Sequence, residues 1–123
     1  KDYKSTMINF YTLQLMHSKH SKLLIKKLKD MNDEVNAPDV KSLQLSLDIL
    51  LNNDLRDDIN KINHQTLLIV GEKDRLTPKS ASEWLESHLK EAELKVIQGA
   101  SHIPFLSHAD EFFDHLDQFL LAA

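Results

Sequence analysis

The chain has 123 residues, of which 41% are hydrophobic and 28% are charged. This length and composition are typical of one small globular domain with a modest core. The absence of cysteine excludes disulfides and thiol nucleophiles and fits a cytoplasmic protein. No apolar run approaches the length that spans a bilayer, and the polar start predicts no signal peptide. Because the first residue is not methionine, we expect that an N-terminal part is missing.

Charge is distributed unevenly along the chain. The overall net charge is −4, but residues 1–30 carry a net charge of +5 and residues 31–123 carry −9. A basic third attached to an acidic body indicates a local site for an acidic partner. Nucleic acid is not the expected partner, because the basic stretch lacks interleaved aromatic residues and any known binding motif.

The first half of the chain predicts helices only. Apolar residues at helical spacing predict one helix from about Asp2 to Met16 and a second from about Lys19 to Met31. A third helix follows Pro38, which is expected at the first helical position. Its apolar residues again recur at helical spacing, and they are Val40, Leu43, Leu47, Leu50 and Leu51.

One face of the second predicted helix is basic. We call this face the basic stripe and define it as Lys19, Lys22, Lys26 and Lys29. A solvated helix face explains such a stripe, and docking of an acidic partner is the alternative explanation.

The second half of the chain alternates strand and helix. The short apolar run Thr66–Val70 predicts a strand buried on both faces, and Glu93–Ile97 predicts a second strand. Thr77-Pro78 predicts the N-cap and first residue of the helix between them, and a last helix follows Ser107–Asp110. This order predicts an α/β fold with two adjacent parallel strands. Since two parallel strands alone do not make a stable sheet, the missing strands are expected from residues outside the chain or from another chain. The exposed sheet edge would then allow self-association.

Two polar residues follow the predicted strands at their carboxyl ends, where open parallel sheets place their active sites. Asp74 comes just after the first strand and His102 just after the second. Adjacent parallel strands would bring the two residues together. Glu72 and Asp110 are competing acids, but Glu72 lies two positions early and Asp110 suits the start of the last helix.

A carboxylate and an imidazole in this arrangement are suited to activating a serine. The imidazole takes the proton of the hydroxyl, and the carboxylate fixes the tautomer of the imidazole and stabilises its cation. In one large class of hydrolases the chain order is serine, then acid, then histidine. The last two members of this order are present here.

These loops resemble a known family. Leu67–Pro78 resembles the acid-bearing strand and loop of α/β-hydrolases, and Gly99–His108 resembles their histidine loop. The wider pattern resembles BioH-type pimeloyl-acyl-carrier-protein methyl ester esterases of biotin synthesis. Three further stretches support this subfamily: Phe10–Met16, Ser46–Leu50 with Asp54–Arg56, and Pro104-Phe105 followed by Ser107-His108 and Glu111-Phe112.

The resemblance implies a fold and a function. The chain would be the C-terminal part of an α/β-hydrolase, with a helical cap in residues 1–60 and part of the core in residues 61–123. The parent would be a serine carboxylesterase acting on a small-molecule or carrier-bound ester, with no cofactor or metal. Lys22 and Lys26 stand where the family's cap carries basic residues that meet an acidic acyl carrier protein. Phe10 and Leu76 are candidates for an acyl pocket, although plain packing explains Phe10 equally well.

The chain also departs from the family pattern. A G-x-S-x-G elbow is absent, because the only glycines are Gly71 and Gly99. The nucleophile and the oxyanion hole are therefore expected outside these residues, and the chain alone is expected to be inactive. Two alternatives remain open. One is another small-molecule hydrolase, such as an enol-lactonase or a C–C bond hydrolase, and the other is a non-catalytic binding module.

Overall fold

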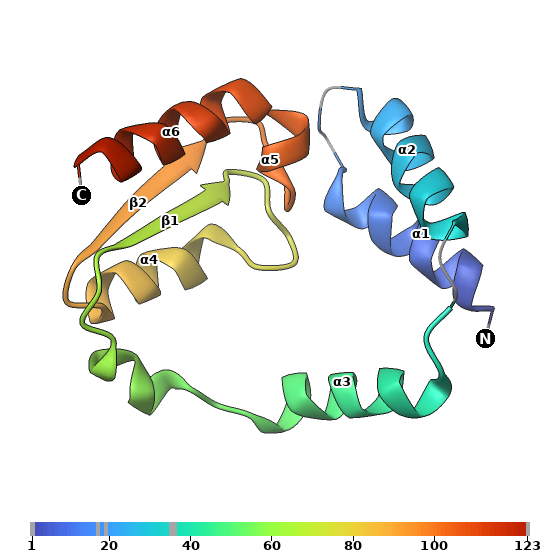
Figure 1. Ribbon diagram of the computed structural model, residues 1–123, viewed down its shortest axis with the longest axis horizontal. Helices are drawn as coiled ribbons and strands as arrows, with labels where there is room; N and C mark the ends of the chain where they lie inside the picture. Colours follow the sequence, from blue (N-terminus) through green and yellow to red (C-terminus); the bar gives the residue numbers. More distant parts are fainter. Residues whose placement is uncertain (1, 17, 19, 35–36, 123) are drawn as a thin grey trace.

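Two parallel strands organise the C-terminal half of the chain (Figure 1). The computed structural model describes residues 2–16, 18, 20–34 and 37–122. It pairs β1 (Thr66–Gly71) with β2 (Ala92–Ile97) in parallel register along their whole length. Helix α4 (Lys79–His88) lies on one side of this pair and α6 (Ala109–Ala122) on the other. The predicted order of strand, helix, strand and helix is confirmed, with one addition: the short helix α5 (Pro104–Ser107) lies between β2 and α6. Ser107, which the sequence predicts at the opening of the last helix, is instead the last residue of α5.

The core of this half lies at the carboxyl ends of the strands. Val70 and Ile97, at those ends, are 5% and 0% exposed. The residues of β1 before Val70 are only half-buried, so the predicted burial of the strand on both faces is wrong for them. The physical reason is that β2 is the only neighbour of β1 within the described residues, which leaves the other edge of β1 unpaired.

Two helices of the N-terminal half pack against each other. They are α1 (Tyr3–Gln14) and α2 (Ser21–Asp33). The Tyr11 hydroxyl donates to Asn32 Oδ1 at 3.3 Å, and Lys4 pairs with Asp33 at 3.0 Å. Lys19 of the basic stripe lies outside the described residues. No helix in residues 2–16, 20–34 or 37–122 is long and apolar enough to cross a membrane.

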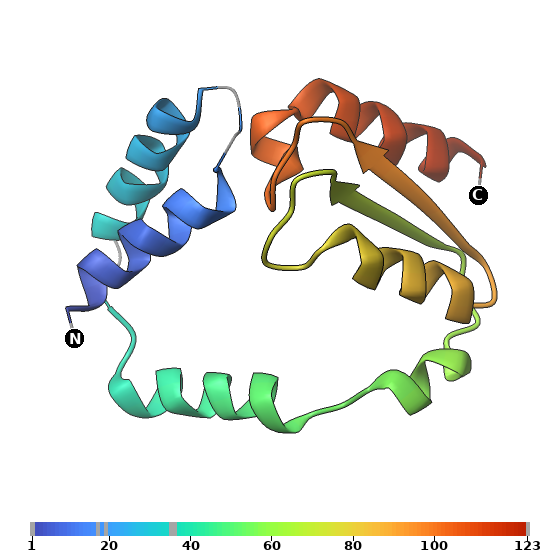
Figure 2. The ribbon, with the colours of Figure 1, turned by 180° about the vertical axis from the view of Figure 1, so that it is seen from behind.

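Helix α3 (Val40–Asn52) and the 3₁₀ helix η1 (Arg56–Lys61) link the two halves in an open arc (Figure 2). The N-cap of α3 is Asp39, whose carboxylate accepts a hydrogen bond from Ser42 N at 2.9 Å. Pro38 therefore lies before the cap, and its predicted place at the first helical position is wrong. The apolar face of α3 is exposed along its length, from 36% at Leu43 to 79% at Val40 and Leu51.

The end of α1 returns to the sheet half of the molecule. Leu15, the residue that caps α1, is completely buried, whereas Leu13 is 37% exposed. The carbonyls of its neighbours Gln14 and Met16 accept hydrogen bonds from the loop after β2, so we call Leu15 the apolar anchor of this junction.

We predict that Leu15→Ala lowers the free energy of unfolding by about 2–5 kcal/mol, because it removes a fully buried side chain and leaves a cavity. Leu13→Ala is the matched control and is expected to cost roughly 1 kcal/mol or less, since less of its side chain leaves water. Urea denaturation of both variants measures the difference. Equal losses would show that Leu15 is not the anchor of this junction.

Candidate active site

Two loops meet at the carboxyl ends of β1 and β2. We call residues 72–78 the acid loop and residues 98–103 the histidine loop. Main-chain hydrogen bonds join them: Glu72 N donates to Ile97 O at 3.0 Å, and Lys73 N donates to Ala100 O at 2.8 Å. The Glu72 carboxylate accepts from Gly99 N at 2.9 Å. Glu72 therefore holds the two loops together and is engaged away from His102.

The loops approach so closely at Gly71 that only glycine fits there. A Cβ atom on Gly71 would lie 2.1 Å from Ser101 O and 2.5 Å from Ala100 O, which are backbone atoms that cannot rotate away. Gly99 is needed for a different reason, since its φ of 75° lies in the left-handed region that side chains disfavour. The two glycines of the chain thus set the separation and the turn of the histidine loop.

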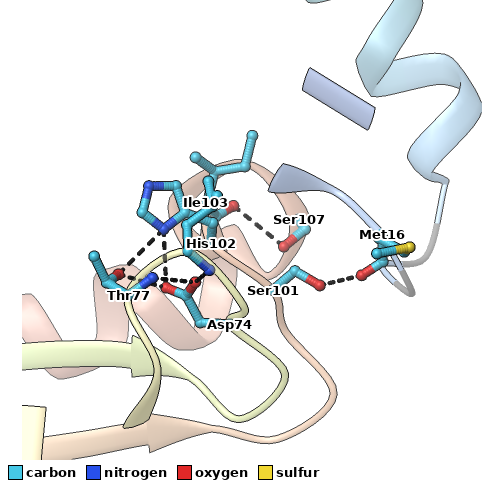
Figure 3. Close-up of polar contacts among 8 residues, drawn as sticks. Met16, Asp74, Thr77, Ser101, His102, Ile103 and Ser107 are labelled. Carbon is cyan, nitrogen blue, oxygen red and sulfur yellow. Dashed lines mark hydrogen bonds and ion pairs between the residues drawn. The ribbon is translucent and has the colours of Figure 1, made fainter. Parts of the chain in front are cut away.

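Asp74 is the buried acid of this site. It is 8% exposed, and both of its oxygens are occupied (Figure 3). Oδ1 accepts from Leu76 N at 2.9 Å and from Thr77 N at 3.0 Å. Oδ2 accepts from Thr77 Oγ1 at 2.8 Å and contacts His102 Nδ1 at 2.9 Å. The predicted approach of Asp74 and His102 at adjacent strand ends is confirmed.

The electrostatics of the site keep Asp74 ionised. Burial raises the pKa of Asp74, but the hydrogen bonds from His102, Thr77 and Leu76 together outweigh it, so the pKa lies below its ordinary value. Because the pKa is lowered in the fold, the carboxylate stabilises the fold above the unfolded-state pKa. That contribution is lost as the pH falls through the folded-state pKa.

The orientation of His102 follows from its partners. A carboxylate only accepts hydrogen bonds, so the ring must carry its proton on Nδ1 when it faces Asp74 Oδ2. Thr77 Oγ1 lies 3.3 Å from the same nitrogen and is a weaker second acceptor. Nε2 forms no hydrogen bond within the described part of the chain, and the side chain is 28% exposed. This arrangement leaves Nε2 free to act as a base toward an incoming hydroxyl.

Thr77 is the site residue that the sequence reasoning missed. It was predicted as the N-cap of the following helix, but Pro78 occupies that position without a side-chain cap. The Thr77 hydroxyl donates to Asp74 instead. The signal was present, since a threonine three residues after an aspartate is typical of a turn in which the carboxylate accepts nearby donors.

Of the remaining candidates, Leu76 reaches Asp74 through its backbone amide, and the others take no part in the contact between Asp74 and His102. Phe10 is 43% exposed on α1, one helical turn before Gln14. Leu76 is half-buried in the acid loop, and Lys22 and Lys26 are exposed on α2. Asp110 lies in the first turn of α6, as its helix-start interpretation predicts. Within the described residues, no cluster of three or more histidine, aspartate or glutamate side chains is arranged to hold a metal ion.

The sequence matches the family model of the alpha/beta hydrolase fold over residues 4–109. The chain therefore belongs to the α/β-hydrolase family. A pimeloyl-[acyl-carrier protein] methyl ester esterase of Nitrosospira multiformis is 33% identical over 119 residues, which cover 97% of this chain and 45% of that relative. The protein of the same name from Neisseria meningitidis is 36% identical over 111 residues, which cover 90% of this chain and 43% of that relative. The chain spans about half the length of the curated relatives it matches.

Solved structures show the same fold. A bromoperoxidase from Bacillus anthracis superposes with a TM-score of 0.84 at 22% identity, covering 98% of this chain and 44% of that one. A thermophilic esterase superposes with a TM-score of 0.72 at 30% identity, covering 98% and 47%. The arrangement of the N-terminal helices relative to the strands is therefore one that these two longer chains also adopt.

We predict that Thr77→Val raises the pKa of Asp74 toward its ordinary value, because the variant removes one hydrogen bond to the ionised carboxylate. The acid-unfolding midpoint should move to higher pH with it. Carboxyl carbon chemical shifts followed through a pH titration measure the change. Thr66→Val is the matched control, since the Thr66 hydroxyl bonds His64 O at the far end of β1. An unchanged pKa of Asp74 in Thr77→Val would contradict the role of Thr77 in stabilising the ionised carboxylate.

Proposed function

We propose that this chain supplies the acid and the histidine of a longer serine carboxylesterase. The observation that carries the proposal is the 2.9 Å contact between His102 Nδ1 and Asp74 Oδ2, at the carboxyl ends of adjacent parallel strands in a member of the α/β-hydrolase family. The esterase names of its relatives support the same reaction class.

The mechanism follows from the free nitrogen of His102. In the proposed parent, a serine from residues outside this chain attacks the ester carbonyl while His102 Nε2 takes its proton. Asp74 holds the ring in the required tautomer and stabilises the imidazolium. His102 then returns the proton to the leaving alcohol. Water repeats the attack on the acyl-enzyme, with His102 again as the base.

The proposed parent also supplies the oxyanion hole. In this fold, one of its amides follows the nucleophile and the other comes from an earlier loop. The chain holds neither the G-x-S-x-G elbow nor a second glycine-rich loop. Residues 1–123 would therefore supply and orient the catalytic base, His102, but not the serine that it activates.

The helices before the sheet would form a cap. We propose residues 1–60 as this cap and residues 61–123 as part of the core. The 3₁₀ helix η1 spans this boundary and packs against α4, so it would join the cap to the core. Phe10 on α1 and Leu76 in the acid loop would then line an acyl pocket between cap and core.

The proposed substrate is the methyl ester of a pimeloyl group carried by an acyl carrier protein, which places the parent in biotin synthesis. The names of the curated relatives support this choice. Substrate profiling of the full-length protein tests it. Preferred hydrolysis of carrier-bound methyl esters supports the proposal, whereas a preference for enol-lactones or for C–C bond cleavage contradicts it.

The basic stripe would receive the acidic carrier. Lys22, Lys26 and Lys29 are spaced by four and three residues on α2, which puts them on one face of the helix, and all three are exposed. None of them takes part in an ion pair with another described residue. Their charges are therefore available to a partner.

We predict that the 123-residue chain by itself does not hydrolyse p-nitrophenyl acetate faster than free imidazole does. It carries the base and its carboxylate but not the proposed nucleophile or oxyanion donors. Release of p-nitrophenolate measures the rate. Faster turnover that a serine-directed inhibitor abolishes would show that a serine of this chain is a nucleophile.

In the full-length protein, Asp74→Asn is expected to lower kcat by roughly 10⁴, because an asparagine amide favours the wrong tautomer of the catalytic histidine. Steady-state kinetics on a small ester measure the loss. Asp110→Asn is the control, and its kcat should stay near that of the wild type because Asp110 lies in the first turn of α6. Similar kcat values for the two variants would remove Asp74 from the mechanism.

The double variant Lys22→Glu, Lys26→Glu is expected to lower kcat/KM for a carrier-bound ester while leaving the rate on a small free ester unchanged. Surface charge acts mainly on association and is screened by salt, so added salt should narrow the difference from wild type. Kinetics on both substrates at two ionic strengths test this. Equal loss on both substrates would indicate damage to the cap, and no loss would return the stripe to a solvated helix face.

A further inference from the structure

The end of α1 is hydrogen-bonded to the histidine loop (Figure 3). The last carbonyls of a helix have no partner within the helix and need donors from elsewhere. Here Gln14 O accepts from the backbone amide of His102 at 3.0 Å. Two residues later, Met16 O accepts from the side-chain hydroxyl of Ser101. Two successive residues of the histidine loop thus donate to the segment that ends α1.

The middle of this junction is shielded from solvent. Ser101 is 2% exposed and Leu15, between the two half-buried acceptor residues, is 0% exposed. Losing a hydrogen bond in such a place is costly, because a shielded acceptor loses its donor and is less accessible to water. The donor of His102 is a backbone amide, which a substitution at position 102 does not remove. The donor of Ser101 is a side-chain hydroxyl, which a substitution at position 101 can remove.

The backbone of the histidine loop is held from both sides. On the sheet side, Ala100 O accepts from Lys73 N of the acid loop at 2.8 Å. On the helix side, Ser101 and His102 donate to the end of α1. The imidazole itself is tied through Nδ1 to Asp74. The direction in which Nε2 points therefore depends on the backbone position that these contacts fix.

We propose that Ser101 is a positioning residue for His102. Its hydroxyl clamps the histidine loop to the end of α1 and so fixes the backbone from which the imidazole projects. This inference rests on the proposed esterase function. A catalytic group must be held within a fraction of an ångström of its working position, because small displacements lower the rate steeply. Ser101 acts through His102 and touches no reacting atom.

The test compares two serines of the same segment in the full-length protein. Ser101→Ala removes the bond to α1. Ser107→Ala removes a bond of the same kind, from Ser107 Oγ to Ile103 O at 3.2 Å, within the segment that follows His102. The first readout is amide hydrogen exchange of His102, which does not require activity. Exchange should be about fivefold faster in Ser101→Ala and within about twofold of wild type in Ser107→Ala.

The second readout is steady-state kinetics on a small ester. Ser101→Ala should lower kcat about fivefold with little change in KM, and Ser107→Ala should change neither. Ser101→Thr keeps the hydroxyl and should restore slow exchange. If Ser101→Ala fails to fold, the threonine variant must fold and exchange slowly for the proposal to stand.

The outcomes distinguish the role of Ser101 from the proposed esterase function. Unchanged amide hydrogen exchange of His102 in Ser101→Ala overturns the claim that the Ser101 hydroxyl holds the histidine loop to the end of α1. Faster exchange with an unchanged kcat overturns the positioning role. If the wild-type protein hydrolyses no ester, the proposed function fails, whereas faster exchange in Ser101→Ala alone would still support the clamp.

Discussion

The parallel pairing of β1 and β2 is the constraint on which the site depends. Because the strands run in the same direction and stay in register from end to end, their following loops leave the sheet at the same edge. The chain then needs a close approach between those loops, which Gly71 permits by having no Cβ. This backbone arrangement brings Asp74 and His102 close together, and their side chains then form the hydrogen bond between Oδ2 and Nδ1.

The acid loop shows how local hydrogen bonding prepares a charged group. Asp74 is buried, and burial alone would favour its neutral form. The hydrogen bond from His102, the amides of Leu76 and Thr77 and the Thr77 hydroxyl together reverse this preference. The acid loop thus supplies three of the four hydrogen bonds that stabilise the ionised carboxylate, and the histidine supplies the fourth.

The strands and the pair of Asp74 and His102 could be predicted from the sequence because both depend on local signals. The apolar runs and the order of strands and helices were sufficient for the fold class, and the resemblance of the two loops pointed to Asp74 and His102. The role of Thr77 was missed because the following Pro78 made a helix cap the simpler interpretation. The contact of Ser101 with Met16 joins residues 85 positions apart, and no periodicity encodes such a distance. The half-burial of β1 likewise depends on which strands stand beside it.

The two oxygens of Asp74 have different tasks. Oδ1 receives the backbone amides of its own loop, and Oδ2 faces Thr77 and the imidazole. A short side chain can do both because its carboxylate lies close to its own backbone. Glutamate would add one methylene and move the carboxylate by about the length of a carbon–carbon bond relative to the backbone amides that Oδ1 accepts. The family order of residues admits either acid, but the hydrogen bonds of this loop match the shorter reach of aspartate.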